Sequence, residues 1–101
     1  MKIKPFSTEL SDEAEADFDK SYEFYYQDSP KVADTLFIRI NLSFENIKQN
    51  PKSFPVAHKD VRKYVVKKFP FVIYYRIVDA VIQVAAIFHT SRNSEIWDER
   101  I

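Results

Sequence analysis

The chain has 101 residues, a net charge of zero, no cysteine and no glycine. This length suits one domain over residues 1–101, and 46% hydrophobic with 16% aromatic residues indicates a packed core. Without cysteine the chain has no disulfides and no thiolate metal sites. Without glycine it lacks the phosphate-binding loops of nucleotide enzymes. We therefore expect no cofactor and no metal.

The charge is unevenly distributed along the sequence. Residues 1–50 carry 6 Lys and Arg against 10 Asp and Glu, whereas residues 51–101 carry 9 against 5. Proteins that grip nucleic acid through its phosphates show a clear basic excess, so we expect no direct sequence-specific nucleic acid binding. The N-terminus lacks the apolar region of a signal peptide, and no apolar run is long enough to span a bilayer. We expect a soluble, cytoplasmic protein without membrane contact.

The first predicted elements are a short strand and a helix. Residues 2–7 alternate partly, and Pro5 favours an edge position for this strand. Ser11 is a typical N-cap and is followed by two carboxylates, which suit the positive end of a helix dipole. Apolar residues then recur at helical spacing to about Asp28.

A second helix is predicted directly after the first. Ser29 and Pro30 fit its N-cap and first position, and Asn50-Pro51 ends it. The break between the helices is so short that we expect an antiparallel helical hairpin. Residues 51–60 are predicted to be an irregular connection.

The second half of the chain predicts three strands, at residues 61–66, 69–78 and 81–88. The boundaries at Lys67-Lys68 and Asp79-Ala80 are tight enough for an antiparallel meander. The fold class is therefore α+β, in the order β-α-α-β-β-β. We expect a small, mostly antiparallel sheet with the helical hairpin packed on one face.

Strand alternation divides the last two strands into a core face and an outer face. The predicted core face of the middle strand consists of Phe71, Ile73, Tyr75 and Ile77. The predicted core face of the last strand consists of Ile82, Val84, Ala86 and Phe88. The predicted outer face includes Tyr74, Arg76, Gln83 and His89, and its mixed character suits a surface that receives a partner.

Several segments in this order carry a family resemblance. They are Ala14-Glu15-Ala16-Asp17, Tyr25-Tyr26, Val61-Arg62, Phe69-Pro70-Phe71-Val72-Ile73-Tyr74-Tyr75-Arg76, and Ala86-Ile87-Phe88-His89 followed by Arg92, Trp97 and Arg100. Over nearly its whole length the chain resembles the RelE/ParE superfamily, the small toxins of bacterial toxin–antitoxin pairs, often labelled plasmid stabilisation proteins. The resemblance implies a cognate antitoxin as partner.

The superfamily divides by target. RelE-like members resemble ribosome-dependent endonucleases that cut mRNA, and their sheets commonly carry an arginine near the start of the middle strand. ParE-like members resemble inhibitors of DNA gyrase and have no hydrolytic chemistry. Here the matching stretch, Pro70-Phe71-Val72, has no cation. The resemblance therefore favours a ParE-like toxin of a type II system, which inhibits DNA gyrase by protein binding and is neutralised by its antitoxin.

Two alternatives remain. The first is a metal-independent, RelE-like endoribonuclease acting on the ribosome and mRNA, for which the catalytic candidates are His89, Arg62, Lys67 and Arg92. The second is a protein of this fold without toxicity. Cleavage without metal needs a base, cations for the phosphorane charge and an acid.

Under the favoured reading, the target-binding or partner-binding residues are Tyr74, Arg76, Gln83, His89, Arg92, Trp97 and Arg100. For His89 catalysis, partner contact and a structural role all remain open. Arg62 fits a structural ion pair better than target binding, whereas Arg100 fits target binding better because it lies in a polar tail. Trp97 either covers the sheet edge or anchors a partner.

Overall fold

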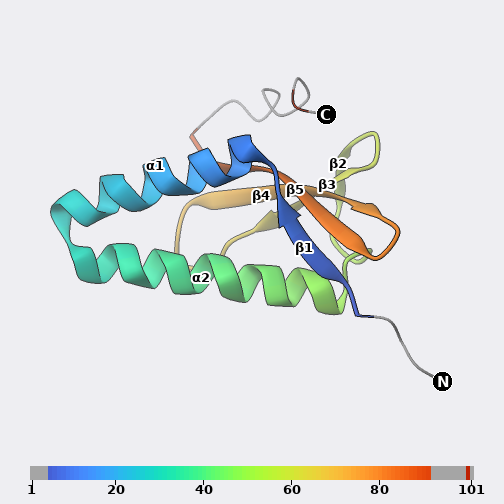
Figure 1. The fold of residues 1–101 in the computed structure, drawn as a ribbon, viewed down its shortest axis with the longest axis horizontal. Coiled ribbons are helices and arrows are strands. Elements are labelled where there is room, and N and C mark those ends of the chain that lie inside the picture. The colour runs from blue at the N-terminus through green and yellow to red at the C-terminus, as the bar shows by residue number, and fades with distance from the viewer. Residues whose placement is uncertain (1–4, 92–99, 101) are drawn as a thin grey trace.

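The computed structural model describes residues 5–91 and residue 100. Within this part of the chain the elements are β1 (Ser7–Leu10), α1 (Asp12–Asp28), α2 (Pro30–Gln49), β2 (Val56–His58), β3 (Val61–Val65), β4 (Phe71–Val78) and β5 (Val81–His89) (Figure 1). The predicted α+β class and the strand–helix–helix–strands order are confirmed.

The largest differences from the prediction concern β1 and β2, whereas the bounds of β3, β4 and β5 differ from it by one or two residues. The first strand begins at Ser7, whose N–H donates to Ala80 O, and it extends to Leu10 because the next N–H, that of Ser11, still pairs with Val84 O. The segment predicted to be irregular contains β2, three residues that are all exposed. A fully exposed three-residue strand has no alternation of apolar and polar residues, which explains why it was missed.

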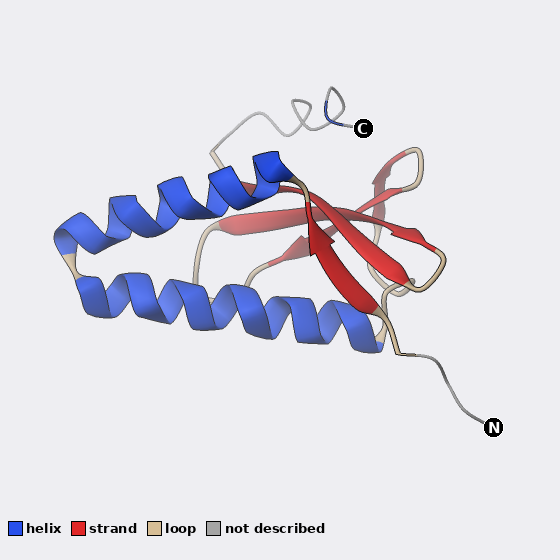
Figure 2. Cartoon of the chain, in the orientation of Figure 1, coloured by secondary structure: helices blue, strands red, loops and turns tan. Residues whose placement is uncertain are grey.

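Serine caps define both helices, as predicted. Ser11 Oγ accepts from the Ala14 N–H at 3.0 Å, and Ser29 Oγ accepts from the Val32 N–H at 3.3 Å. The Ser29 N–H also donates to a carbonyl in the last turn of α1, so this residue ends one helix and starts the next. The helices consequently form an antiparallel hairpin whose open end meets the sheet (Figure 2).

The five-stranded sheet of the described chain has the order β1-β5-β4-β3-β2. β1 runs parallel to β5, and the other pairs are antiparallel. The helices pack on one face of this sheet, which we call the helix face. The buried core there consists of Ala14, Leu36, Ile40, Ile47, Tyr64, Val66, Phe71, Ile73, Tyr75, Ile82, Val84 and Ile87.

A β-bulge changes the facing of β5. Tyr74 lies opposite Ala86, but the next residue of β4, Tyr75, lies opposite Val84, so Ala85 is an extra residue on β5. Every side chain after a bulge turns to the other face, because strand alternation has a period of two. The predicted facing is therefore right for β4 and for the first half of β5.

The facing predicted for the second half of β5 is wrong. Ile87 belongs to the helix-face core, whereas Ala86 and Phe88 lie on the opposite face in a second small cluster. His89 lies opposite Phe71 and shares the helix face with it, at the end of the strand. The outer face is thus defined here by Lys63, Val65, Val72, Tyr74, Arg76, Val78 and Gln83.

Turns are made without glycine. Lys59, Lys68 and Asp79 have φ values of 53°, 70° and 54°. A non-glycine residue in this left-handed region costs roughly 1–2 kcal/mol, although aspartate tolerates it better than lysine does. Two of these turns place a lysine at the tip of a connection between strands, where its side chain stays exposed.

Candidate functional site

One part of the outer face is closed. Tyr74 is 5% exposed and Phe88 is 2% exposed, and together with Val61 and Ala86 they form the second buried cluster. The rings of Tyr74 and Phe88 meet edge to face with centroids 5.9 Å apart. Tyr74 was predicted to bind a partner, but the structure gives its side chain a packing role within the molecule.

Arg100 also lies inside the molecule. Its guanidinium carbon stands 4.8 Å from the centroid of the Phe88 ring, and its two terminal nitrogens donate to the Asp17 carboxylate at 2.6 and 3.2 Å. Only 14% of the Arg100 side chain and 7% of the Asp17 side chain are exposed. Arg100 was predicted to bind a target or partner, and in this structure its charge is paired with the buried Asp17 carboxylate.

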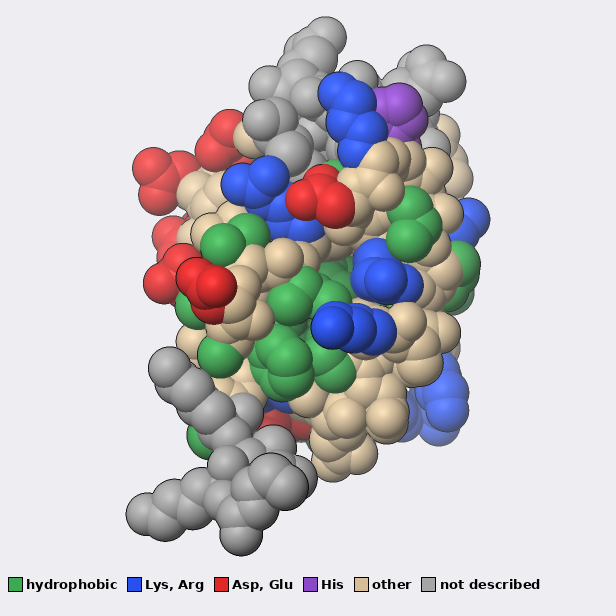
Figure 3. Space-filling model, turned by 90° about the vertical axis from the view of Figure 1, so that its right-hand side faces the viewer, with side chains coloured by type: hydrophobic (Ala, Val, Ile, Leu, Met, Phe, Trp, Pro, Cys, Tyr) green, Lys and Arg blue, Asp and Glu red, His purple; other side chains and the backbone are tan. Residues whose placement is uncertain are grey.

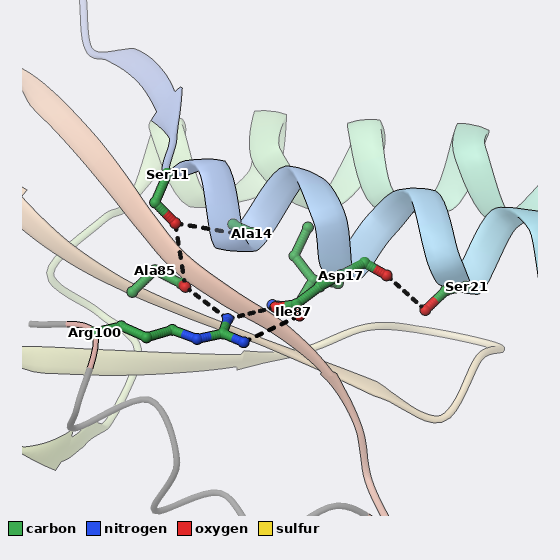
Figure 4. A network of polar contacts seen from close by, with 7 residues as sticks. All are labelled: Ser11, Ala14, Asp17, Ser21, Ala85, Ile87 and Arg100. Carbon is green, nitrogen blue, oxygen red and sulfur yellow. Dashed lines mark hydrogen bonds and ion pairs between the residues drawn. The ribbon is translucent and has the colours of Figure 1, made fainter.

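The Asp17–Arg100 pair supplies hydrogen-bond partners to backbone groups on the unpaired edge of β5, beside the bulge. β1 stops pairing with β5 at Val84, so the following backbone groups need other partners. Asp17 Oδ2 accepts from the Ile87 N–H at 3.0 Å, and Arg100 donates to Ala85 O at 3.1 Å (Figure 4). The N-cap of α1 and the side chains of Asp17 and Arg100 thereby make the hydrogen bonds that a neighbouring strand would otherwise make.

Sequence reasoning missed Asp17, although a signal was present. Asp17 follows Ala14 by three residues, so it lies on the buried stripe of α1, where a carboxylate must be paired. Ser11 joins the same network, since its Oγ donates to Ala85 O at 3.4 Å. The signal identifies a buried carboxylate but does not identify its partner, 83 residues away.

The other part of the outer face is open. Arg76 Nε donates to Gln83 Oε1 at 3.0 Å, so the structure brings these two predicted residues together. A cavity of about 270 Å³ adjoins them and is also lined by Glu9, Ser11 and Arg100. Next to Arg76 the outer face exposes Lys63, and Val65 and Val78 are 63% and 38% exposed.

Hydrophobic and basic side chains also adjoin one another at the end of the molecule that carries the β4–β5 turn. In the view of this end, acidic side chains lie mostly toward the left, and Lys and Arg side chains lie mostly toward the right (Figure 3). This separation follows the sequence, because the acidic residues are concentrated in α1 and the basic ones in residues 51–78.

His89 has a structural environment. Its ring packs edge-on against Phe71 with centroids 5.4 Å apart. The Ser91 N–H donates to His89 Nδ1 at 3.1 Å, so the proton of the neutral ring lies on Nε2. The predicted outer facing of His89 is wrong because the bulge at Ala85 turns it to the helix face.

Arg62 holds the connection between α2 and β2. One terminal nitrogen donates to the backbone carbonyls of Lys52 and Phe54 at 3.0 and 2.7 Å. The same connection accepts a buried bond from Tyr75, whose hydroxyl donates to Pro51 O at 2.7 Å. Burial raises the pKa of Tyr75 to about 12, although the nearby charge of Arg62 lowers it.

The catalytic candidates do not converge within the described residues. Lys67 lies two residues beyond the end of β3, at the end of the sheet that also carries His89, with Phe71 on the strand between them. Arg62 lies opposite Tyr75, four residues along β4 from Phe71. That separation is about 13 Å at roughly 3.3 Å per residue. Arg92 and Trp97, also predicted as site residues, lie outside the described residues.

Residues 5–91 and residue 100 lack two further features. No helix there is long and apolar enough to cross a membrane. No group of three or more His, Asp or Glu side chains there could hold a metal ion.

Comparisons with known proteins agree with this fold. A family model described as "ParE toxin of type II toxin-antitoxin system, parDE" matches residues 8–94. A solved structure titled "Chromosomal ParDE TA system from P. aeruginosa" superposes with a TM-score of 0.74 at 23% identity, covering 83% of this chain and 95% of that one. No curated protein sequence matches. Because the family model covers most of its length, the chain belongs to the ParE toxin family of type II toxin–antitoxin systems.

Proposed function

We propose that this toxin acts by binding DNA gyrase and inhibiting it, and that a cognate antitoxin masks the toxin. Two facts support the proposal. The chain belongs to the ParE branch of the superfamily, whose members resemble gyrase inhibitors. A structure of the same fold is titled as a ParDE toxin–antitoxin system, which supports an antitoxin partner for this chain.

The observation that carries the choice of binding over catalysis is the position of Arg62. Its guanidinium donates to two backbone carbonyls, and its strand register places it about 13 Å along β4 from the level of His89. A metal-free ribonuclease needs its cation and its general base around one phosphate. Arg62 cannot serve the same phosphate as His89 in this arrangement.

The surroundings of His89 support the same choice. Its Nδ1 accepts a bond from the backbone. The one described candidate cation at this end of the sheet, Lys67, lies in the bend after β3, and β4 separates β3 from the strand of His89. Strands are spaced about 4.8 Å apart, so β3 and β5, the strands that lead to these two residues, are separated by roughly 10 Å. The ring of Phe71, which is 2% exposed, fills the helix face between them.

A supercoiling assay tests the proposal. Relaxed plasmid, purified gyrase and ATP are incubated with increasing amounts of the toxin, and supercoiled product is measured. We expect supercoiling to fall with toxin concentration and to recover when purified antitoxin is added first. Undiminished supercoiling at a large excess of folded toxin would contradict the gyrase assignment.

A parallel measurement addresses cleavage. Primer extension on a translated message is carried out with and without the toxin. We expect no new ends, because binding to gyrase does not cut RNA. Codon-phased ends that appear only with the toxin would overturn the proposed mechanism and support the endoribonuclease.

A further inference from the structure

The fold separates the charges of this chain into two regions. α1 carries seven Asp and Glu against one Lys, whereas residues 51–78 carry seven Lys and Arg against one Asp. Several of these basic residues are used structurally or lie at turns, as Arg62 and Lys68 do. Lys63 and Arg76 are different, because both lie in the middle of strands on the outer face.

Apolar side chains accompany these two cations. Val65 on β3 is 63% exposed and Val78 on β4 is 38% exposed, and both face the same way as Lys63 and Arg76. An exposed apolar side chain beside a cation suits a partner segment that is itself amphipathic, with apolar residues and carboxylates in alternation. The basic charge of residues 51–78 selects an acidic segment over a basic one.

Arg76 is prepared for a carboxylate. Its Nε donates to Gln83 at 3.0 Å, which fixes the plane of the guanidinium. Among the described residues no acceptor is bonded to its two terminal nitrogens, and the guanidinium borders a cavity of about 270 Å³. Two parallel N–H groups match the two oxygens of a carboxylate, and partial burial strengthens such a pair.

Glu9 lies on the rim of the same cavity. It is exposed and stands opposite Gln83 across the β1–β5 pair. Its negative charge opposes an incoming carboxylate, so it sets a limit to the affinity of this site. Removal of the Glu9 charge should therefore strengthen binding, whereas removal of the Arg76 charge should weaken it.

We infer that the open part of the outer face, formed by Lys63, Val65, Arg76 and Val78, binds an acidic amphipathic segment of the antitoxin, with one carboxylate of that segment on the Arg76 guanidinium. This inference rests on the proposed function, because it assigns a surface to the antitoxin. It does not depend on which target the toxin inhibits.

The test uses the toxin and the protein encoded by the adjoining reading frame as the probe. Affinity is measured by titration calorimetry for the wild type and for Arg76→Gln, Arg76→Lys, Lys63→Gln and Lys20→Gln. Lys20 is exposed on α1 and serves as the control with the same loss of charge. We expect Arg76→Gln to weaken binding by about tenfold or more and Lys63→Gln by roughly threefold, while Lys20→Gln stays within about twofold.

Two further measurements define the mode of binding. Arg76→Lys keeps the charge but loses the two-pronged geometry, so we expect an affinity between those of the wild type and Arg76→Gln. Glu9→Gln should tighten binding by roughly threefold, because it removes the opposing charge. Hydrogen exchange of the wild-type complex should show protection within residues 61–78, a readout that requires no variant to fold.

The outcomes separate the inference from the function on which it rests. A complex that forms normally with Arg76→Gln and Lys63→Gln, without exchange protection in residues 61–78, overturns the inference and leaves the toxin–antitoxin function intact. Failure of the wild-type toxin both to bind the probe and to reduce supercoiling overturns the proposed function itself.

Discussion

The two faces of the sheet use the same strands for different purposes. On the helix face, Ile73 and Tyr75 have no exposed surface, and the helices close this side. On the outer face, the neighbouring residues Tyr74 and Arg76 belong to two zones. One zone is buried, with Arg100 over the ring of Phe88, and the other is open.

The comparison shows that alternation along a strand assigns a face and does not assign a role. Tyr74 and Arg76 point to the same side of β4. Tyr74 is 5% exposed because it packs against Phe88, whereas Arg76 borders a cavity. The helix face stabilises the fold throughout, whereas we propose that the outer face divides between stability and recognition.

The largest expected effect is a difference between the two faces in how much a substitution lowers the free energy of unfolding. Ile73→Ala removes a fully buried side chain from the helix face, so we expect the free energy of unfolding to fall by about 3–4 kcal/mol. Val65→Ala removes a valine that is 63% exposed on the outer face, so its cost should stay below about 1 kcal/mol. Urea unfolding monitored by circular dichroism measures both. Comparable losses for the two variants would contradict the division of the faces.

The sequence predicted much of this arrangement. Ser11 and Ser29 identified both helix starts, because a serine followed by carboxylates or proline is a strong local signal. Alternation gave the right facing for β4 and for β5 as far as Val84. The helix starts and the facing of these strands depend on residues close together in the sequence, so the sequence was enough to predict them.

The remaining features depend on contacts that the sequence does not display. The bulge at Ala85 lies within a run of small apolar residues with no local signal for an extra residue. It reversed the facing of Ile87 and His89. The bond between Asp17 and Arg100 joins residues 83 positions apart, and the polar character of the tail predicted an exposed Arg100 instead.

The next effect concerns the closed zone of the outer face and its link to α1. Asp17→Ala leaves Arg100 without its buried anion and the Ile87 N–H without its acceptor, so we expect a loss of about 3 kcal/mol. Arg100→Met should cost less, about 2 kcal/mol, because Asp17 still accepts from the backbone. Thermal and urea unfolding give both values. A greater loss for Arg100→Met would show that the backbone bond of Asp17 contributes little.

A smaller effect concerns the Tyr75 hydroxyl group, which reaches from the helix face to the α2–β2 connection. Tyr75→Phe leaves Pro51 O, which is buried, without its donor, so we expect a loss of about 1–2 kcal/mol near neutral pH. Urea unfolding measures this loss, with Tyr22→Phe as control because the hydroxyl of Tyr22 bonds Asp34 in an exposed position. A loss in the control as large as that of Tyr75→Phe would contradict the role of burial.

The Tyr75 hydroxyl should also make the free energy of unfolding depend on pH. Burial raises the pKa of Tyr75 to about 12 in the folded chain, whereas an unfolded tyrosine titrates near 10. Between these values the unfolded state loses the proton and the folded state keeps it, so the free energy of unfolding falls as the pH rises. The stabilisation linked to the raised pKa of Tyr75 is therefore fully present below about pH 10. The advantage of the wild type over Tyr75→Phe should therefore narrow between about pH 10 and 12, and a constant difference would contradict the raised pKa.

The smallest expected effect on stability lies in the open zone. Gln83→Leu removes the acceptor of Arg76 Nε, but both side chains are only half-buried, so water can replace the bond. We expect the free energy of unfolding to change by less than about 0.5 kcal/mol. Binding should respond more strongly, because a guanidinium that is free to rotate loses its fixed plane before it meets a carboxylate. An affinity for the antitoxin reduced by roughly threefold at unchanged stability would show that this zone serves recognition, and a loss of stability without loss of affinity would assign it to the fold.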